Sequence, residues 1–167
     1  MKMIDVGDKQ KTERVAIARG FVSMAPATVG IVRRGESEKG DVLAAARLAG
    51  ILAAKKTPDI VPLCHPIALS AVDVEARPRA RGVEIVATVR TVDRTGVEME
   101  ALTAVSAGCL TVYDMLKRYE RGMRIEALEL IEKRGGRSGT WRRAGARAAR
   151  PAAAPARRAR STRTRGE

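Results

Sequence analysis

Alternation of apolar and polar residues marks the β-strands of this chain. Every second residue is apolar from Val72 to Ala76 and again from Val83 to Val89, and a polar turn at 78–82 separates the two stretches. A period of two predicts half-buried strands, so this pair is expected to form a β-hairpin. Apolar segments at 14–24 and 124–132 predict two further strands.

Helical signals occupy the segments between these strands. Pro26 suits the first turn of one helix, and Gly35 suits its end. Asp41 is expected to cap a second helix, which is rich in Ala and Leu. A third helix is expected to be closed by Gly122. The helices are predicted over 25–34, 41–56 and 98–120, while prolines at 58, 62 and 66 predict an irregular stretch.

The predicted elements follow the order strand, helices, strand, strand, helix, strand. This order is typical of an α+β ferredoxin-like fold, in which helices pack on one face of an antiparallel sheet. Residues 1–141 are expected to form one domain. Residues 142–167 consist mostly of Ala, Arg and Pro and offer no apolar face to bury, so they are expected to be a disordered tail.

Most of the net charge of +13 lies in this tail, where nine arginines and one glutamate contribute +8. The domain itself is only mildly basic, which suits an anionic small molecule as well as a nucleic acid. Aromatic residues make up 2% of the chain, too few for platforms that stack bases. A nucleic-acid-binding protein is therefore an alternative that we do not favour, and a structural subunit without an active site is another.

Cysteine content and hydropathy indicate a cytoplasmic protein that does not enter a membrane. The two cysteines, Cys64 and Cys109, form no disulfide pattern, and neither a signal peptide nor a long apolar run is visible. A zinc site is not expected, because one histidine and two distant cysteines lack the usual ligand spacing.

The only histidine, His65, lies between prolines in a loop and next to Cys64. A lone histidine is often structural. However, an imidazole in a rigid loop also suits proton transfer or a contact with phosphate. His65 is therefore a candidate site residue.

Three carboxylates on the predicted 98–120 helix are candidates for acid–base chemistry. Glu98 and Glu100 lie in the first turn, where acids also favour the helix dipole, and residues two apart do not share a face. Asp114 and Lys117 share a face near the other end, where an exposed salt bridge is the simplest alternative. Glu100 and Asp114 would lie about 21 Å apart along one helix. Either the glutamate pair lies off the helix or a second subunit completes the site, and we prefer the second interpretation.

Two basic features are candidates for binding an anion. Lys39 comes just before the 41–56 helix, and the N-terminus of a helix attracts negative charge. The loop at 133–139 is basic and rich in glycine, so its backbone can approach a phosphate closely, but it lacks the spacing of a P-loop.

Several linked motifs carry a resemblance to a known family. They are Lys39-Gly40-Asp41-Val42, the segments at 45–51, 53–57, 60–66 and 95–104, and Tyr113-Asp114-Met115-Leu116-Lys117. In this order they resemble the MoaC family of molybdenum cofactor biosynthesis. The likeness extends from about Met3 to Trp141.

The resemblance implies a ferredoxin-like lyase of the phosphorus–oxygen type. Such an enzyme converts (8S)-3′,8-cyclo-7,8-dihydroguanosine 5′-triphosphate to cyclic pyranopterin monophosphate and releases diphosphate. The resemblance also implies a homohexamer, a trimer of dimers with sites between subunits. No cofactor is expected, although the sequence leaves a need for Mg²⁺ open. The implied catalytic residues are Asp114, Lys117 and Lys39, and the implied substrate-binding residues are Leu63, Cys64, His65, Glu98, Met99 and Glu100.

Overall fold

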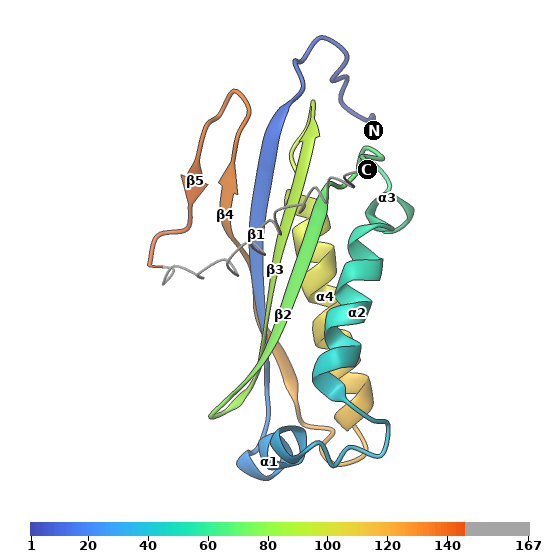
Figure 1. Ribbon diagram of the computed structural model, residues 1–167, viewed down its shortest axis with the longest axis vertical. Coiled ribbons are helices and arrows are strands. Elements are labelled where there is room, and N and C mark those ends of the chain that lie inside the picture. The colour runs from blue at the N-terminus through green and yellow to red at the C-terminus, as the bar shows by residue number, and fades with distance from the viewer. Residues whose placement is uncertain (146–167) are drawn as a thin grey trace, which may run out of the picture.

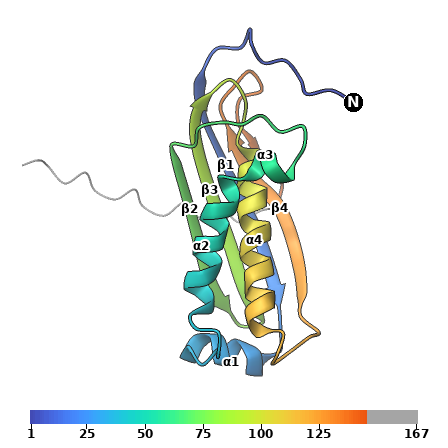
Figure 2. The ribbon, with the colours of Figure 1, turned by 90° about the vertical axis from the view of Figure 1, so that its right-hand side faces the viewer.

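A five-stranded antiparallel sheet with the order β2-β3-β1-β4-β5 forms the centre of the molecule. Helices α2 and α4 stand side by side on one face of this sheet (Figures 1 and 2). The computed structural model describes residues 1–145. Its elements are β1 (Thr12–Ser23), α1 (Pro26–Arg34), α2 (Val42–Ala54), α3 (Thr57–Ile60), β2 (Ala71–Arg79), β3 (Gly82–Asp93), α4 (Glu98–Leu116), β4 (Arg124–Arg134) and β5 (Trp141–Arg142).

The predicted ferredoxin-like arrangement is confirmed. β2 and β3 form the expected hairpin, with Ala71 opposite Arg90 at one end and Arg79 opposite Gly82 at the turn. β1 lies between β3 and β4 and is antiparallel to both. Both large helices cover the same face, so the other face of the sheet carries no helix within the described residues (Figure 1).

Local sequence signals explain where α1 ends and where α2 begins. Gly35 takes the left-handed conformation, with φ of 70°, and its backbone N–H donates to the carbonyl of Val32. The Asp41 carboxylate accepts hydrogen bonds from the backbone N–H groups of Leu43 and Ala44, both at 2.9 Å. Both predicted helix boundaries are therefore confirmed.

Two helix predictions need correction. The stretch after α2 is not wholly irregular, since α3 begins at Thr57 and accommodates Pro58 in its first turn, where a missing N–H is not needed. α4 ends at Leu116 instead of near Glu120. The Glu120 carboxylate accepts hydrogen bonds from the backbone N–H of Ala25 and the hydroxyl of Thr28, so this segment packs against the start of α1.

Small residues allow the helices and the sheet to approach closely. A Cβ at Gly20 in β1 would lie 2.6 Å from Cγ1 of Val105 and 2.9 Å from Sγ of Cys109, both on α4. A Cβ at Gly50 in α2 would lie 2.9 Å from the carbonyl oxygen of Ala104. The core is therefore built by close contact between backbones and short side chains, which explains how a chain with so few aromatic residues folds.

The short strand β5 lies next to the end of the domain and was not predicted. Its residue Arg142 pairs with Glu132 of β4. Of the predicted disordered tail at 142–167, residues 146–167 lie outside the described residues. Among residues 1–145, no helix has the length and apolar character needed to cross a membrane.

Candidate active site

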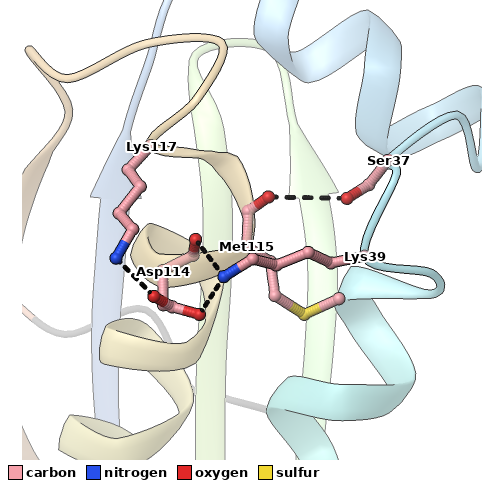
Figure 3. Close-up of polar contacts among 5 residues, drawn as sticks. All are labelled: Ser37, Lys39, Asp114, Met115 and Lys117. Carbon is pink, nitrogen blue, oxygen red and sulfur yellow. Dashed lines mark hydrogen bonds and ion pairs between the residues drawn. The ribbon is translucent and has the colours of Figure 1, made fainter.

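Lys39, Asp114 and Lys117 form one polar cluster at the end of α4 (Figure 3). The Nζ atom of Lys39, from the loop before α2, lies 2.6 Å from Oδ2 of Asp114 and 3.2 Å from its carbonyl oxygen. The Nζ atom of Lys117 lies 2.7 Å from Oδ1 of the same carboxylate. Each of the three side chains is about half exposed. The three residues predicted to be catalytic are thus brought together.

The two lysines determine the ionisation of this cluster. Hydrogen bonds from Lys117 and Lys39 lower the pKa of Asp114 to about 2. The same contact raises the pKa of Lys117, because Asp114 accepts its hydrogen bond. Near neutral pH the cluster therefore consists of one carboxylate between two ammonium groups. Such a group can bind an anion and can accept a proton if the lysines are drawn away.

The loop that carries Lys39 is fixed to the end of α4 by contacts that the sequence did not suggest. The Ser37 side chain is buried, and its hydroxyl lies 3.5 Å from the carbonyl oxygen of Met115 (Figure 3). The backbone N–H of Glu38 donates to the Tyr119 hydroxyl at 3.0 Å. Ser37 and Tyr119 each lie two residues from a cluster lysine in the sequence, but the contact of Ser37 with Met115 and that of Tyr119 with Glu38 depend on the tertiary fold.

A second polar group, Cys64 and Glu100, lies at the opposite end of α4. The Glu100 side chain is in the first turn of the helix and is only 1% exposed. The Cys64 thiol lies 3.5 Å from Oε1 of Glu100 and donates to it. The other carboxyl oxygen, Oε2, is buried and has no hydrogen-bond partner among the described residues.

Burial governs the ionisation of this second pair. It raises the pKa of Glu100, since a charged carboxylate is poorly solvated there. Burial, followed by the negative charge of Glu100, raises the pKa of Cys64 to about 11. The thiol is therefore protonated near neutral pH and is not an activated nucleophile.

The other residues predicted to bind substrate are sequence neighbours of Cys64 or of Glu100. Leu63 is 50% exposed, Met99 is 39% exposed, and His65 and Glu98 are half-buried. Glu98 and Glu100 thus differ in burial, as expected for helix positions two residues apart. Contact between Cys64 and Glu100 places the loop after α3 beside the start of α4 (Figure 2).

The structure separates the two groups within one chain. Glu98 and Glu100 are both part of α4, so the alternative in which the glutamate pair lies off the helix is wrong. Glu100 and Asp114 are therefore about 21 Å apart along a continuous helix. A small molecule cannot contact both groups of the same chain at once.

A third polar region lies where β1 begins. Here the glycine-rich loop after β4 meets the segment that precedes β1 and encloses a pocket of about 470 Å³. The sequence predicts this loop only as a weak candidate for binding an anion, and the residues before β1 that line the same pocket were not predicted. The pocket is lined by Asp8, Lys9, Gln10, Thr12, Arg14, Gly136, Arg137 and Ser138.

Metal-ligating side chains do not cluster in residues 1–145. No group of three or more His, Cys, Asp or Glu residues there has an arrangement that could hold a metal ion.

Comparison with known proteins identifies the family. A family model described as the MoaC family matches residues 3–136. A protein named cyclic pyranopterin monophosphate synthase from Thermomicrobium roseum is 59% identical over 144 residues, which cover 85% of this chain and 87% of the relative. A protein of the same name from Novosphingobium aromaticivorans is 58% identical over 143 residues, which cover 86% of this chain and 91% of the relative. This chain therefore belongs to the MoaC family.

Proposed function

We propose that this chain is a cyclic pyranopterin monophosphate synthase of molybdenum cofactor biosynthesis. It converts (8S)-3′,8-cyclo-7,8-dihydroguanosine 5′-triphosphate to cyclic pyranopterin monophosphate and releases diphosphate. The observation that carries this proposal is the cluster of Lys39, Asp114 and Lys117. It occurs in a chain that is 59% identical to a relative with this name.

The proposed reaction needs groups that move protons and groups that offset negative charge. Rearranging a purine into a pterin opens and closes rings without net redox change. Forming the cyclic phosphate makes an oxygen of the substrate the nucleophile at phosphorus and makes diphosphate the leaving group. Ammonium groups such as those of Lys39 and Lys117 stabilise the charge that develops on the phosphate oxygens.

Asp114 is the proposed acid–base residue, although its two lysine partners make it a weak base in the free protein. An anionic substrate competes with this carboxylate for Lys39 and Lys117. Once the lysines contact the substrate, the Asp114 carboxylate loses its stabilising partners and becomes more basic. Substrate binding itself therefore prepares Asp114 to accept a proton.

We propose that the complete site lies between two copies of the chain. One copy supplies Lys39, Asp114 and Lys117, and the other supplies the group around Cys64 and Glu100. The separation of about 21 Å within one chain supports this arrangement. It agrees with the homohexamer, a trimer of dimers, that the family resemblance implies.

The remaining parts of the proposal concern cofactors and location. Acid–base residues and cations suffice for a reaction without redox change, so we propose that no organic cofactor takes part. Activity after exhaustive dialysis against EDTA, measured with and without added Mg²⁺, tests whether a metal is needed. We place the enzyme in the cytoplasm, acting on a small nucleotide.

The direct test is to incubate the full chain with the cyclised nucleotide and to measure released diphosphate together with the cyclic phosphate product. Asp114→Asn is expected to lower turnover by about 10² to 10⁴, the usual contribution of acid–base catalysis. Asp73→Asn, which changes an exposed aspartate on β2, is the matched control and should retain turnover. Absence of product with the unmodified chain would contradict the proposed function. Full activity of Asp114→Asn would contradict the role of this residue.

A further inference from the structure

The Glu100 carboxyl uses only part of its hydrogen-bonding capacity. Its side chain is 1% exposed, and Oε2 has no partner among the described residues. A buried polar atom without a partner costs free energy, so native proteins rarely keep one without a reason. Oε2 therefore remains an unused acceptor for an N–H or O–H donor, which must displace the atoms that cover Oε2 to reach it.

Cys64 determines how this carboxyl is held. Its thiol donates to Oε1 at 3.5 Å, and its backbone N–H donates to the carbonyl of Val61 at 3.0 Å. The backbone bond closes a turn, and the thiol on this turn contacts Glu100 in the first turn of α4. Among the described residues, the Cys64 thiol is the side chain that hydrogen-bonds this carboxyl and so orients it.

The hydrogen bond to Oε1 also occupies the only side-chain donor that Cys64 has. A thiol carries one S–H group, so a thiol that donates to Oε1 cannot donate to a substrate at the same time. The family resemblance implies that Cys64 contacts substrate. The geometry points to a different role for it.

We propose that Cys64 is a positioning residue, whose thiol holds Oε1 of Glu100 so that Oε2 is left free to accept a hydrogen bond from the substrate. This inference rests on the proposed function, because the ring system of the proposed substrate carries the N–H groups that would donate to Oε2. Cys64 then acts on the reaction through Glu100 and makes no essential polar contact of its own.

A double-mutant cycle tests this role with the cyclised nucleotide as substrate. Cys64→Ala removes the donor and is expected to lower kcat/KM about 10-fold, as for a lost hydrogen bond to a buried carboxyl. Cys64→Ser keeps a donor and should restore most of this loss. In a Glu100→Gln background, Cys64→Ala should cause little further loss, because residues that act through each other are not additive.

Two kinetic outcomes would overturn the proposal. Additive losses in the double variant would mean that Cys64 acts independently of Glu100. Equal losses in Cys64→Ser and Cys64→Ala would mean that the donor is not what matters. Both outcomes require an active unmodified enzyme, whereas an unmodified enzyme without turnover would overturn the proposed function, and this role with it.

A measurement without substrate tests the contact itself. Alkylation by iodoacetamide is followed against pH on the peptide that contains Cys64, so that buried Cys109 does not contribute. Removing the negative charge in Glu100→Gln should shift the midpoint of alkylation to lower pH. An unchanged midpoint would show that the thiol and the carboxyl do not interact, and it would overturn the proposal even if the kinetic losses were non-additive.

Discussion

Asp114 and Glu100 are carboxylic acids on the same helix, yet their surroundings move their pKa values in opposite directions. Hydrogen bonds from Lys117 and Lys39 lower the pKa of Asp114, whereas burial raises that of Glu100. Pairs of acids with separated pKa values are suited to different tasks in one reaction. Asp114 therefore becomes ionised at a lower pH than an ordinary aspartate, and Glu100 stays neutral to a higher pH than an ordinary glutamate.

Removing one lysine should raise the pKa of Asp114. In Lys117→Met the carboxylate loses its strongest partner, so its pKa is expected to move from about 2 towards the ordinary range of an aspartate. Carbon-detected NMR of the carboxyl resonances during an acid titration measures this directly. Arg118→Met is the matched control, because Arg118 pairs with Glu38 and does not contact Asp114. An unchanged Asp114 titration in Lys117→Met would contradict the assigned ion pair.

Glu100 should make the protein less stable as the pH rises. Because burial raises its pKa, the folded state holds a proton that the unfolded state releases once the pH exceeds roughly 4 to 5. The stability of the unmodified chain should therefore fall relative to that of Glu100→Gln, by at most about 1.4 kcal/mol per pH unit, until the pH passes the raised pKa. Urea unfolding at a series of pH values measures the difference.

Glu98→Gln removes a half-buried carboxyl from the same turn and serves as the control for this series. A constant difference between the unmodified chain and Glu100→Gln from pH 4 to pH 8 would mean that Glu100 titrates equally in both states.

Sequence reasoning found the chemistry of the candidate site but not all of its contacts. The pairing of Asp114 with Lys117 follows from helical spacing and was predicted. Lys39 and Asp114 are 75 residues apart, and Cys64 and Glu100 are 36 residues apart. No local pattern specifies these two contacts, because they depend on how α2, α3 and α4 pack.

At the level of elements, the predictions succeeded where a local physical signal exists. The alternation of β2 and β3 and the cap at Asp41 are such signals. The predictions that were wrong or missing concern segments whose local structure depends on tertiary contacts. The segment after Leu116 is not helical, and its residue Glu120 hydrogen-bonds the start of α1. The strand β5 has too few residues to show a periodic pattern.

The contact between α2 and α4 can be tested at Gly50. Gly→Ala within a helix normally stabilises by about 0.5–1 kcal/mol. Here the added Cβ would lie 2.9 Å from the Ala104 carbonyl oxygen and 3.1 Å from Val74, so Gly50→Ala is expected to destabilise by about 1–3 kcal/mol. Thermal and urea unfolding measure both effects.

Gly30 in α1 provides the matched control for this change. The three atoms nearest to a Cβ there all belong to the guanidinium of Arg34, the closest at 3.0 Å, and this flexible side chain can move. Gly30→Ala should therefore stabilise the protein. If both variants were stabilised, α2 and α4 would not be packed as closely as described.

For the whole molecule, the main result is that the candidate site residues occupy two ends of one helix. The proposed site, which combines both groups, then requires two copies, and this can be tested with variants that each impair one group. Asp114→Asn retains the group around Cys64 and Glu100, and Glu100→Gln retains the lysine cluster. When the two variants are co-expressed with different tags and purified together, about a quarter of the sites should combine two intact halves.

Diphosphate release by the mixture should accordingly reach about a quarter of the activity of the unmodified enzyme when the two chains associate at random. Each variant alone provides the baseline. A mixture no more active than its components would mean that each site is built within a single chain.

The helix α4 also has a consequence for how the chain can change during evolution. Each residue inserted into or deleted from a helix turns everything beyond it by about 100° and shifts it by about 1.5 Å. An insertion between Glu100 and Asp114 would therefore rotate and shift the group at one end of α4 relative to the group at the other end in every copy. The number of residues in this segment is therefore expected to be constant, whatever the identity of the individual residues. We expect length variation among related chains to be confined to the loops and the termini.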